Sequence, residues 1–208
     1  IKLEGEEPVY TVSESFAAAF TRTERGLQQT ENWPVESTDS VTRATLEQGG
    51  NTLTVDVSED ADGNKTYTAS DTARTETPDT AAAQAFVSSA ATLYFSSSAD
   101  FKPTDEALAA YGLAEPSATL TVEWTRTDDA SGAQESVTSV LYLGAVDANG
   151  DYYARLADSN AVSTLNATAL SGVLGMTLDG MLPAEKESAP ESAPASESGS
   201  VSAASAAD

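Results

Sequence analysis

Residues 118–125 alternate strictly between apolar and polar side chains, and this alternation constrains the fold more than any other feature. The apolar residues are Ala118, Leu120, Val122 and Trp124, and the polar ones are three threonines and a glutamate. Successive side chains of a β-strand point to opposite faces of a sheet, so the pattern predicts a strand with one buried and one solvated face. We expect Trp124 to be buried against a helix.

Turn signals separate further strand patterns on both sides of this segment. Leu53, Val55 and Val57 alternate with polar residues, and Asp62-Gly63 then leads into residues 65–68. Because Asp-Gly tolerates the positive φ of a tight turn, this stretch predicts a hairpin. Downstream, turns at 128–132, 149–150 and 159–160 precede strands predicted over 137–143, 152–157 and 161–165, which form a meander.

Three helices are predicted from their capping residues, which are Thr77, Thr104 and Asn166. In the first helix Pro78 takes the first helical position, and the apolar spacing continues to about Tyr94. The second helix is short, and Gly112 suits the left-handed conformation that ends it. The third carries the leucine-rich stretch that follows Asn166.

Strands and helices in this order predict an α+β fold, in which an antiparallel β-sheet of hairpins and a meander is covered by a few helices on one face. The order of strands followed by a helix recurs between residues 41–94 and 117–175. The echo is weak, and it is not a repeat of sequence.

The two ends of the chain differ in composition from the middle. Residues 1–37 form an acidic arm in which the spacing over Ser15–Leu27 is compatible with a helix, and residues 38–182 hold the predicted α+β domain. Residues 183–208 consist largely of Ala, Ser, Glu and Pro and are predicted to be a disordered tail. Because the chain begins at Ile1 rather than Met, we expect that a signal or membrane anchor has been cut away.

The charge balance and the missing residue types exclude several functions. The chain has no Cys and no His, which removes disulfides, thiolate nucleophiles, Ser–His machinery and the usual zinc ligands. It carries 10 Lys and Arg against 33 Asp and Glu, a net charge of −23, without a basic patch. Nucleic acid is therefore not a partner, and anionic lipid would repel the domain, so membrane contact would run only through a missing N-terminal anchor. No cofactor is predicted.

Two acidic clusters have the 1, 3, 5 spacing of a calcium-binding loop. They are Asp60, Asp62 and Asn64, and Asp147, Asn149 and Asp151. Both lack the glycine at position six and the bidentate glutamate at position twelve of that loop. Both also fall where hairpin turns are predicted, and turns favour Asp and Asn in any case. They are weak metal-site candidates, and the simpler interpretation is a structural turn.

Residues 108–174 carry a series of short motifs. These are Tyr111-Gly112-Leu113, Pro116, the strand at 118–124, Leu143-Gly144, Tyr152-Tyr153-Ala154-Arg155-Leu156 and the stretch Leu170–Leu174. In this order they resemble the bacterial domain-of-unknown-function 4340 family, over roughly residues 38 to 178. The resemblance implies an extracytoplasmic domain behind one N-terminal membrane anchor, often encoded near exporter-type ABC transporter components, and it implies no catalytic residues.

The expected function is therefore a non-enzymatic binding or accessory module at the bacterial cell envelope, whose partner is a protein or an envelope component. One alternative is a carboxylate-based hydrolase of envelope glycans, which would need a cleft with two acids about 5–10 Å apart. Another is a calcium-stabilised adhesion module. Tyr152 and Tyr153 must face opposite sides of their strand, so at most one is a core residue. The other is a solvated sheet tyrosine or part of a binding surface.

Overall fold

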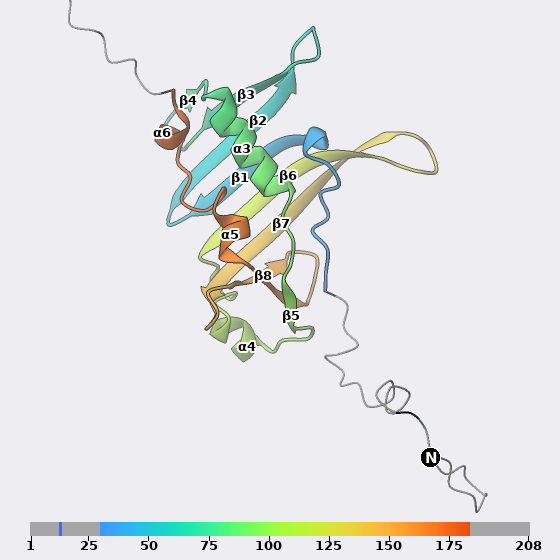
Figure 1. The fold of residues 1–208 in the computed structure, drawn as a ribbon, viewed down its shortest axis with the longest axis vertical. Coiled ribbons are helices and arrows are strands. Elements are labelled where there is room, and N and C mark those ends of the chain that lie inside the picture. Colours follow the sequence, from blue (N-terminus) through green and yellow to red (C-terminus); the bar gives the residue numbers. More distant parts are fainter. Residues whose placement is uncertain (1–12, 14–29, 184–208) are drawn as a thin grey trace, which may run out of the picture.

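The structure, a computed structural model, describes residue 13 and residues 30–183. These residues form one antiparallel sheet of nine strands in the order β4-β3-β2-β1-β6-β7-β8-β9-β5 (Figure 1). The predicted α+β class, with an antiparallel sheet and a few helices, is confirmed.

The strands are β1 (Val41–Gln48), β2 (Asn51–Glu59), β3 (Lys65–Ser70), β4 (Thr75–Glu76), β5 (Ser97–Asp100), β6 (Ala118–Thr127), β7 (Gln134–Val146), β8 (Tyr152–Leu156) and β9 (Val162–Leu165). The helices are the 3-10 turn η1 (Thr38–Ser40), α3 (Thr80–Ala91), α4 (Asp105–Ala110), α5 (Ala167–Leu170) and α6 (Leu178–Met181). The hairpin of β2 and β3 and the meander of β6 to β9 are present as predicted.

The sheet is built from two similar halves. Strands β1 to β4 and strands β6 to β9 each form a meander, and their first strands, β1 and β6, lie side by side and antiparallel. Each meander leads into a helix with an amide or carboxylate cap, Asp79 before α3 and Asn166 before α5. The seventh residue after each cap, Phe86 or Val173, is fully buried. The weak sequence echo is thus a repeat of topology.

The core lies on one face of the sheet, called the inner face, where α3 and α5 contact each other and α3 contacts β1, β3 and β6. Strand β6 contributes the four apolar residues of its alternation, and β1 places Leu46 opposite Leu120. Trp124 is 2% exposed, as predicted, and its indole Nε1–H donates a hydrogen bond of 2.9 Å to Ser139 Oγ. Trp33 and Val35 also belong to this core.

The start of α3 differs from the prediction. The N-cap is Asp79 rather than Thr77, because the Asp79 carboxylate accepts a hydrogen bond of 3.0 Å from the backbone N–H of Ala82. Asp79 also donates its own backbone N–H to the carbonyl of Met181, at 2.8 Å. Pro78 therefore precedes the cap, and the helix ends at Ala91, short of residue 94. Aspartate is the stronger capping residue of the two, and the contact with α6 reinforces it.

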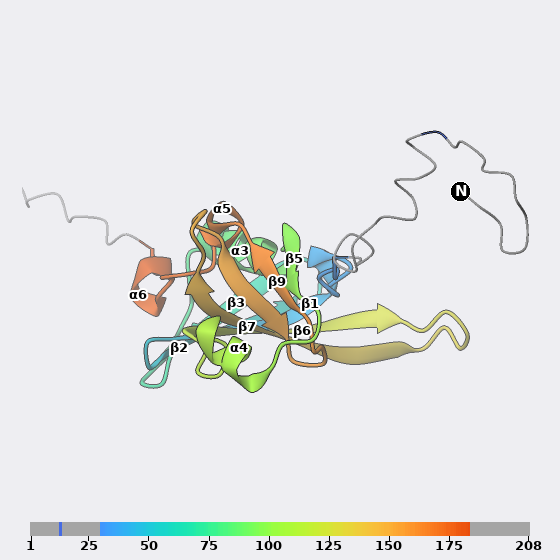
Figure 2. The same cartoon turned by 90° about the horizontal axis from the view of Figure 1, so that it is seen from below.

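Helix α4 also corrects the prediction, since it does not share a face with the other helices. Its capping by Thr104 and the positive φ of Gly112 are as predicted. Figure 2 shows α4 on the side of the sheet opposite to α3 and α5. The rest of that side, called the outer face, carries the polar residues of the alternating strands, such as Thr45, Thr54 and Thr121.

Two segments were not predicted as regular structure. Strand β5 adds to the free side of β9, and α6 lies beside β3. The helix expected over Ser15–Leu27 and the tail expected over 184–208 lie outside the described residues. Within residue 13 and residues 30–183, no helix has both the length and the apolar character needed to cross a bilayer.

Candidate functional site

The first acidic cluster forms the turn between β2 and β3. Asp60 Oδ1 accepts hydrogen bonds from the backbone N–H groups of Asp62 and Asn64, both at 2.9 Å. These donors, with the Asn64 backbone contributing most, hold the pKa of Asp60 below its ordinary value. The carboxylate is thus engaged in closing its own turn.

The second cluster has the same geometry between β7 and β8. Asp147 Oδ1 accepts from the backbone N–H groups of Asn149 and Asp151, at 2.8 and 2.9 Å. The bond from Asp151 is the main cause of the lowered pKa of Asp147. Asp151 in turn accepts from the side-chain amide of Asn166, at 2.9 Å. Among the residues that the structure describes, no group of three or more His, Cys, Asp and Glu is placed to hold a metal ion.

We expect calcium and magnesium to change the melting temperature equally and slightly at fixed ionic strength, because screening does not discriminate between the two ions. A specific site would raise it progressively with calcium alone. Asp147→Asn keeps an oxygen acceptor for the turn and should stay near wild type, whereas Asp147→Ala should be less stable. Since folding lowers the pKa of Asp147, its contribution is present at neutral pH and lost as pH falls through the folded-state pKa.

A calcium-selective rise that disappears in Asp147→Asn would contradict this interpretation. So would the same result with Asp60→Asn for the first cluster. Either outcome would promote the calcium-stabilised adhesion module.

Two of the motifs that carried the family resemblance, Tyr111-Gly112-Leu113 and Leu143-Gly144, meet where the turn that ends α4 lies against β7. The backbone N–H of Ala145 donates a hydrogen bond of 2.8 Å to the Tyr111 carbonyl oxygen. The pairing of β7 with β8 shifts register between Leu143 and Val146, which frees the Ala145 N–H for this bond. Gly144 lies against the backbone of residues 111 and 112, where a side chain would have no room. These motif positions therefore have a structural role.

Tyr153 lies on the outer face beside this junction, whereas Tyr152 packs against the core. The rings of Tyr111 and Tyr153 are 4.5 Å apart between centroids and tilted by 46°. They border a shallow hollow of about 310 Å³. It is lined by Ser97, Ala99, Tyr111, Asp147, Asn149, Tyr153 and Thr164. The structure thus brings the second acidic turn next to two tyrosines, while the first turn lies on the other meander.

Tyr142 and Arg155 continue this surface along the outer face. They are direct cross-strand neighbours on β7 and β8, and the guanidinium carbon of Arg155 lies 5.5 Å from the centroid of the Tyr142 ring. That distance is typical of a cation–π contact. We call Tyr111, Tyr142, Tyr153 and Arg155 together the tyrosine–arginine surface. The sequence analysis did not identify Tyr142 or Arg155 as site residues. The alternation of side chains along the two predicted strands could have placed both on the solvated face.

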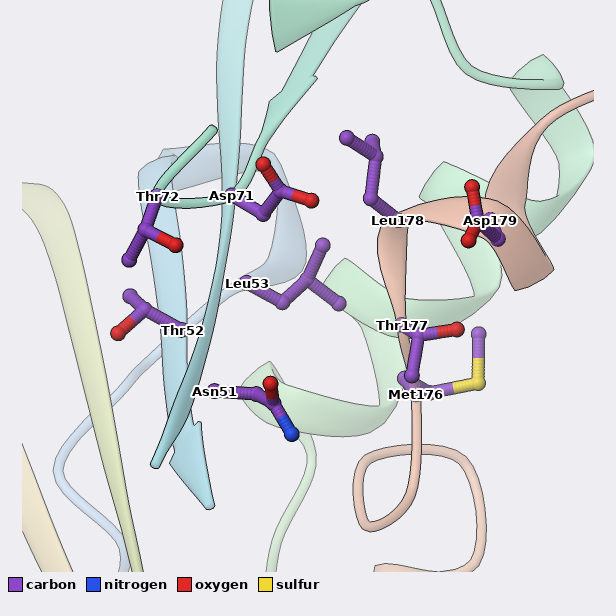
Figure 3. A pocket seen from close by; sticks show the side chains of 9 residues that line it. All are labelled: Asn51, Thr52, Leu53, Asp71, Thr72, Met176, Thr177, Leu178 and Asp179. Atoms are coloured by element: carbon purple, nitrogen blue, oxygen red, sulfur yellow. The ribbon is translucent and has the colours of Figure 1, made fainter. Parts of the chain in front are cut away.

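A second hollow, of about 210 Å³, lies between the first meander and α6 (Figure 3). Figure 3 shows Asp71 and Thr72 on one side and residues 176–179 on the other. Asp179 forms an ion pair with Arg74. Asp71 accepts two backbone N–H groups, from Ala73 and then Arg74, and these lower its pKa. Since a general acid needs a raised pKa, Asp71 is not suited to that role.

Comparison with known proteins gives one match. The family model described as "Domain of unknown function (DUF4340)" matches residues 72–179. The chain belongs to this family. No curated protein and no solved structure matches it. The DUF4340 match runs from the turn before β4 into α6, so it contains the whole tyrosine–arginine surface. It begins later than the resemblance, which started at residue 38 and therefore included β1 to β3.

Proposed function

We propose that this DUF4340 domain is a non-enzymatic binding or accessory module that engages its partner through the outer face of the sheet. The observation that carries the proposal is the tyrosine–arginine surface. Tyrosine and arginine are enriched among the residues that contribute most to protein interfaces. Here three tyrosines and one arginine adjoin on a sheet face whose helical cover, in the described part of the chain, is α4 alone.

The titration behaviour of the acids favours binding over glycan hydrolysis. Among the described residues, each carboxyl group with a shifted pKa is shifted downward; these are Asp60, Asp71, Glu106, Asp128 and Asp147. In each case hydrogen-bond donors close by in sequence cause most of the shift. A retaining or inverting glycosidase needs one carboxylic acid with a raised pKa. The acids with a lowered pKa therefore stabilise turns or the start of a helix, and none of them has the raised pKa of a general acid.

The setting of the module is part of the same proposal. The family resemblance supports an extracytoplasmic domain tethered to the bacterial membrane by an N-terminal anchor, close to exporter-type ABC transporter components. The net charge of −23 keeps such a domain away from anionic headgroups and leaves its outer face available. The partner is then a protein or another component of the envelope.

Site-specific photo-cross-linking in the full chain tests this function. A benzophenone amino acid replaces Thr119, which lies opposite Tyr142, or Thr68, which lies on the first meander, as the matched control. We expect adducts with one envelope component from position 119 and few or none from position 68. Equal yields, or none from position 119, would contradict the proposal. Release of dye from labelled peptidoglycan would instead favour the hydrolase.

A further inference from the structure

The other described arginines all have carboxylate partners. Arg43 Nε lies 2.6 Å from Asp56, directly across on β2, and Arg43 also reaches Glu123 on β6 at 3.4 Å. Arg126 pairs with Glu135, its cross-strand neighbour on β7, at 3.1 Å. Arg74 pairs with Asp179. On the outer face, the sheet thus places an acid directly across from Arg43 on each of its two neighbouring strands.

Arg155 breaks this pattern. Its cross-strand neighbour on β7 is Tyr142, and the pairing of β8 with β9 covers only Tyr152 to Ala154, beyond which β9 begins with the apolar Val162 and offers no acid. The Nε atom of Arg155 is buried and has no hydrogen-bond partner among the described residues. A buried donor without an acceptor destabilises the state that contains it. The free domain holds a guanidinium that is positioned on the Tyr142 ring and has no carboxylate partner in the described part of the chain.

We propose that Arg155, held on the Tyr142 ring, is an anchor for a carboxylate of a partner protein. The end of a guanidinium, with its two Nη groups, forms a planar fork that matches the two oxygens of a carboxylate. Contact with the ring fixes the plane of the guanidinium before binding, which lowers the entropy lost when the partner docks. This inference rests on the proposed function and specifies the chemical group that the tyrosine–arginine surface would bind.

The charge of the domain selects the kind of partner. At −23, the domain repels polyanions such as a phosphate-rich polymer at long range. A protein segment with one aspartate or glutamate among neutral or basic residues is attracted as a whole and still supplies the acceptor. The half-buried Val140 and Tyr153 offer apolar contact beside Arg155, as a protein side chain requires. We therefore assign the acceptor to a protein carboxylate.

The cross-linking experiment, repeated with Arg155→Gln, separates this inference from the proposed function. We expect the adduct from position 119 to fall at least about tenfold in Arg155→Gln, and less in Arg155→Lys, which keeps the charge but loses the fork. Arg43→Gln, which removes an arginine already paired on the same face, should leave the yield unchanged. An adduct that persists in Arg155→Gln overturns the anchor but keeps the binding module. Loss of the wild-type adduct overturns the binding module.

A direct probe uses the arginine Nε–H signals in NMR spectra of the full chain. N-acetylglutamate N-methylamide should shift the Arg155 signal in a saturable way, while its glutamine analogue should not, and the Arg126 signal should stay in place. No shift with the carboxylate overturns the anchor. A stronger response to inorganic phosphate overturns the choice of a protein carboxylate. An unchanged melting temperature of Arg155→Gln confirms that the variants are folded.

Discussion

Trp124→Ala is expected to lower the free energy of unfolding by about 3–5 kcal/mol. The side chain is 2% exposed and extends the buried row of β6 at the end nearest η1, so its removal leaves a cavity in the core. Its indole N–H is also satisfied by Ser139, a buried hydroxyl. Urea unfolding of the full chain measures the loss, and an unchanged slope with denaturant would show that the same surface is exposed on unfolding.

Two variants separate packing from hydrogen bonding at this position. Trp124→Phe retains much of the apolar volume, so it should cost less than Trp124→Ala. Ser139→Ala keeps the indole but leaves its buried N–H unpaired, which should cost about 1–3 kcal/mol. In a Trp33→Phe background, Trp124 fluorescence should be blue-shifted and protected from quenchers. Red-shifted and easily quenched emission would show that the assigned face of β6 is wrong.

The sequence is informative wherever one segment carries its own pattern. Strand β6 follows from the alternation of residues 118–125, and the β2–β3 turn follows from Asp62-Gly63. Such signals arise because side-chain direction and turn geometry are local properties. The same holds for Thr104 and Gly112, which define the two ends of α4.

Elements that depend on distant contacts could not be predicted in this way. Strand β5 reads Ser-Ser-Ala-Asp, without any alternation, and it is a strand because β9 presents a free side to it. The shift of the α3 cap to Asp79 depends in part on Met181, which is far away in sequence. The pairing of β1 with β6, which places the two meanders side by side, could not be predicted either, because it joins segments far apart in the sequence.

The same distinction between local and long-range signals applies to the candidate site. Alternation predicts that one of Tyr152 and Tyr153 faces outward, but only the structure shows that it is Tyr153 and that Tyr111 meets it. Which residue lies opposite Arg155 depends on the register between β7 and β8. This register in turn depends on the bulge after Leu143. The sequence of each strand taken alone therefore cannot reveal that the Arg155 guanidinium lacks a carboxylate partner.

Gly144→Ala is expected to cost about 3 kcal/mol, at the upper end of overpacking effects. A Cβ at Gly144 would collide with the Tyr111 carbonyl oxygen and would lie 3.1 Å from the carbonyl carbon of Gly112. These are backbone atoms, so no rotation of a side chain relieves the clash. Relief requires α4 to move off β7, which breaks the bond from Ala145 to Tyr111 and separates the tyrosine rings. Urea unfolding measures the stability.

The matched control is Gly180→Ala, because Gly180 lies in α6 with an ordinary φ and its Cβ would come only within 3.4 Å of Thr177 Oγ1. That change should alter stability by less than about 1 kcal/mol. Hydrogen exchange adds a second readout: the Ala145 amide should lose protection in Gly144→Ala, while the amides of β1 keep theirs. If Gly144→Ala is as stable as wild type, α4 does not dock on the β7 bulge as described. The position of Tyr111 beside Tyr153, on which the tyrosine–arginine surface depends, would then be wrong as well.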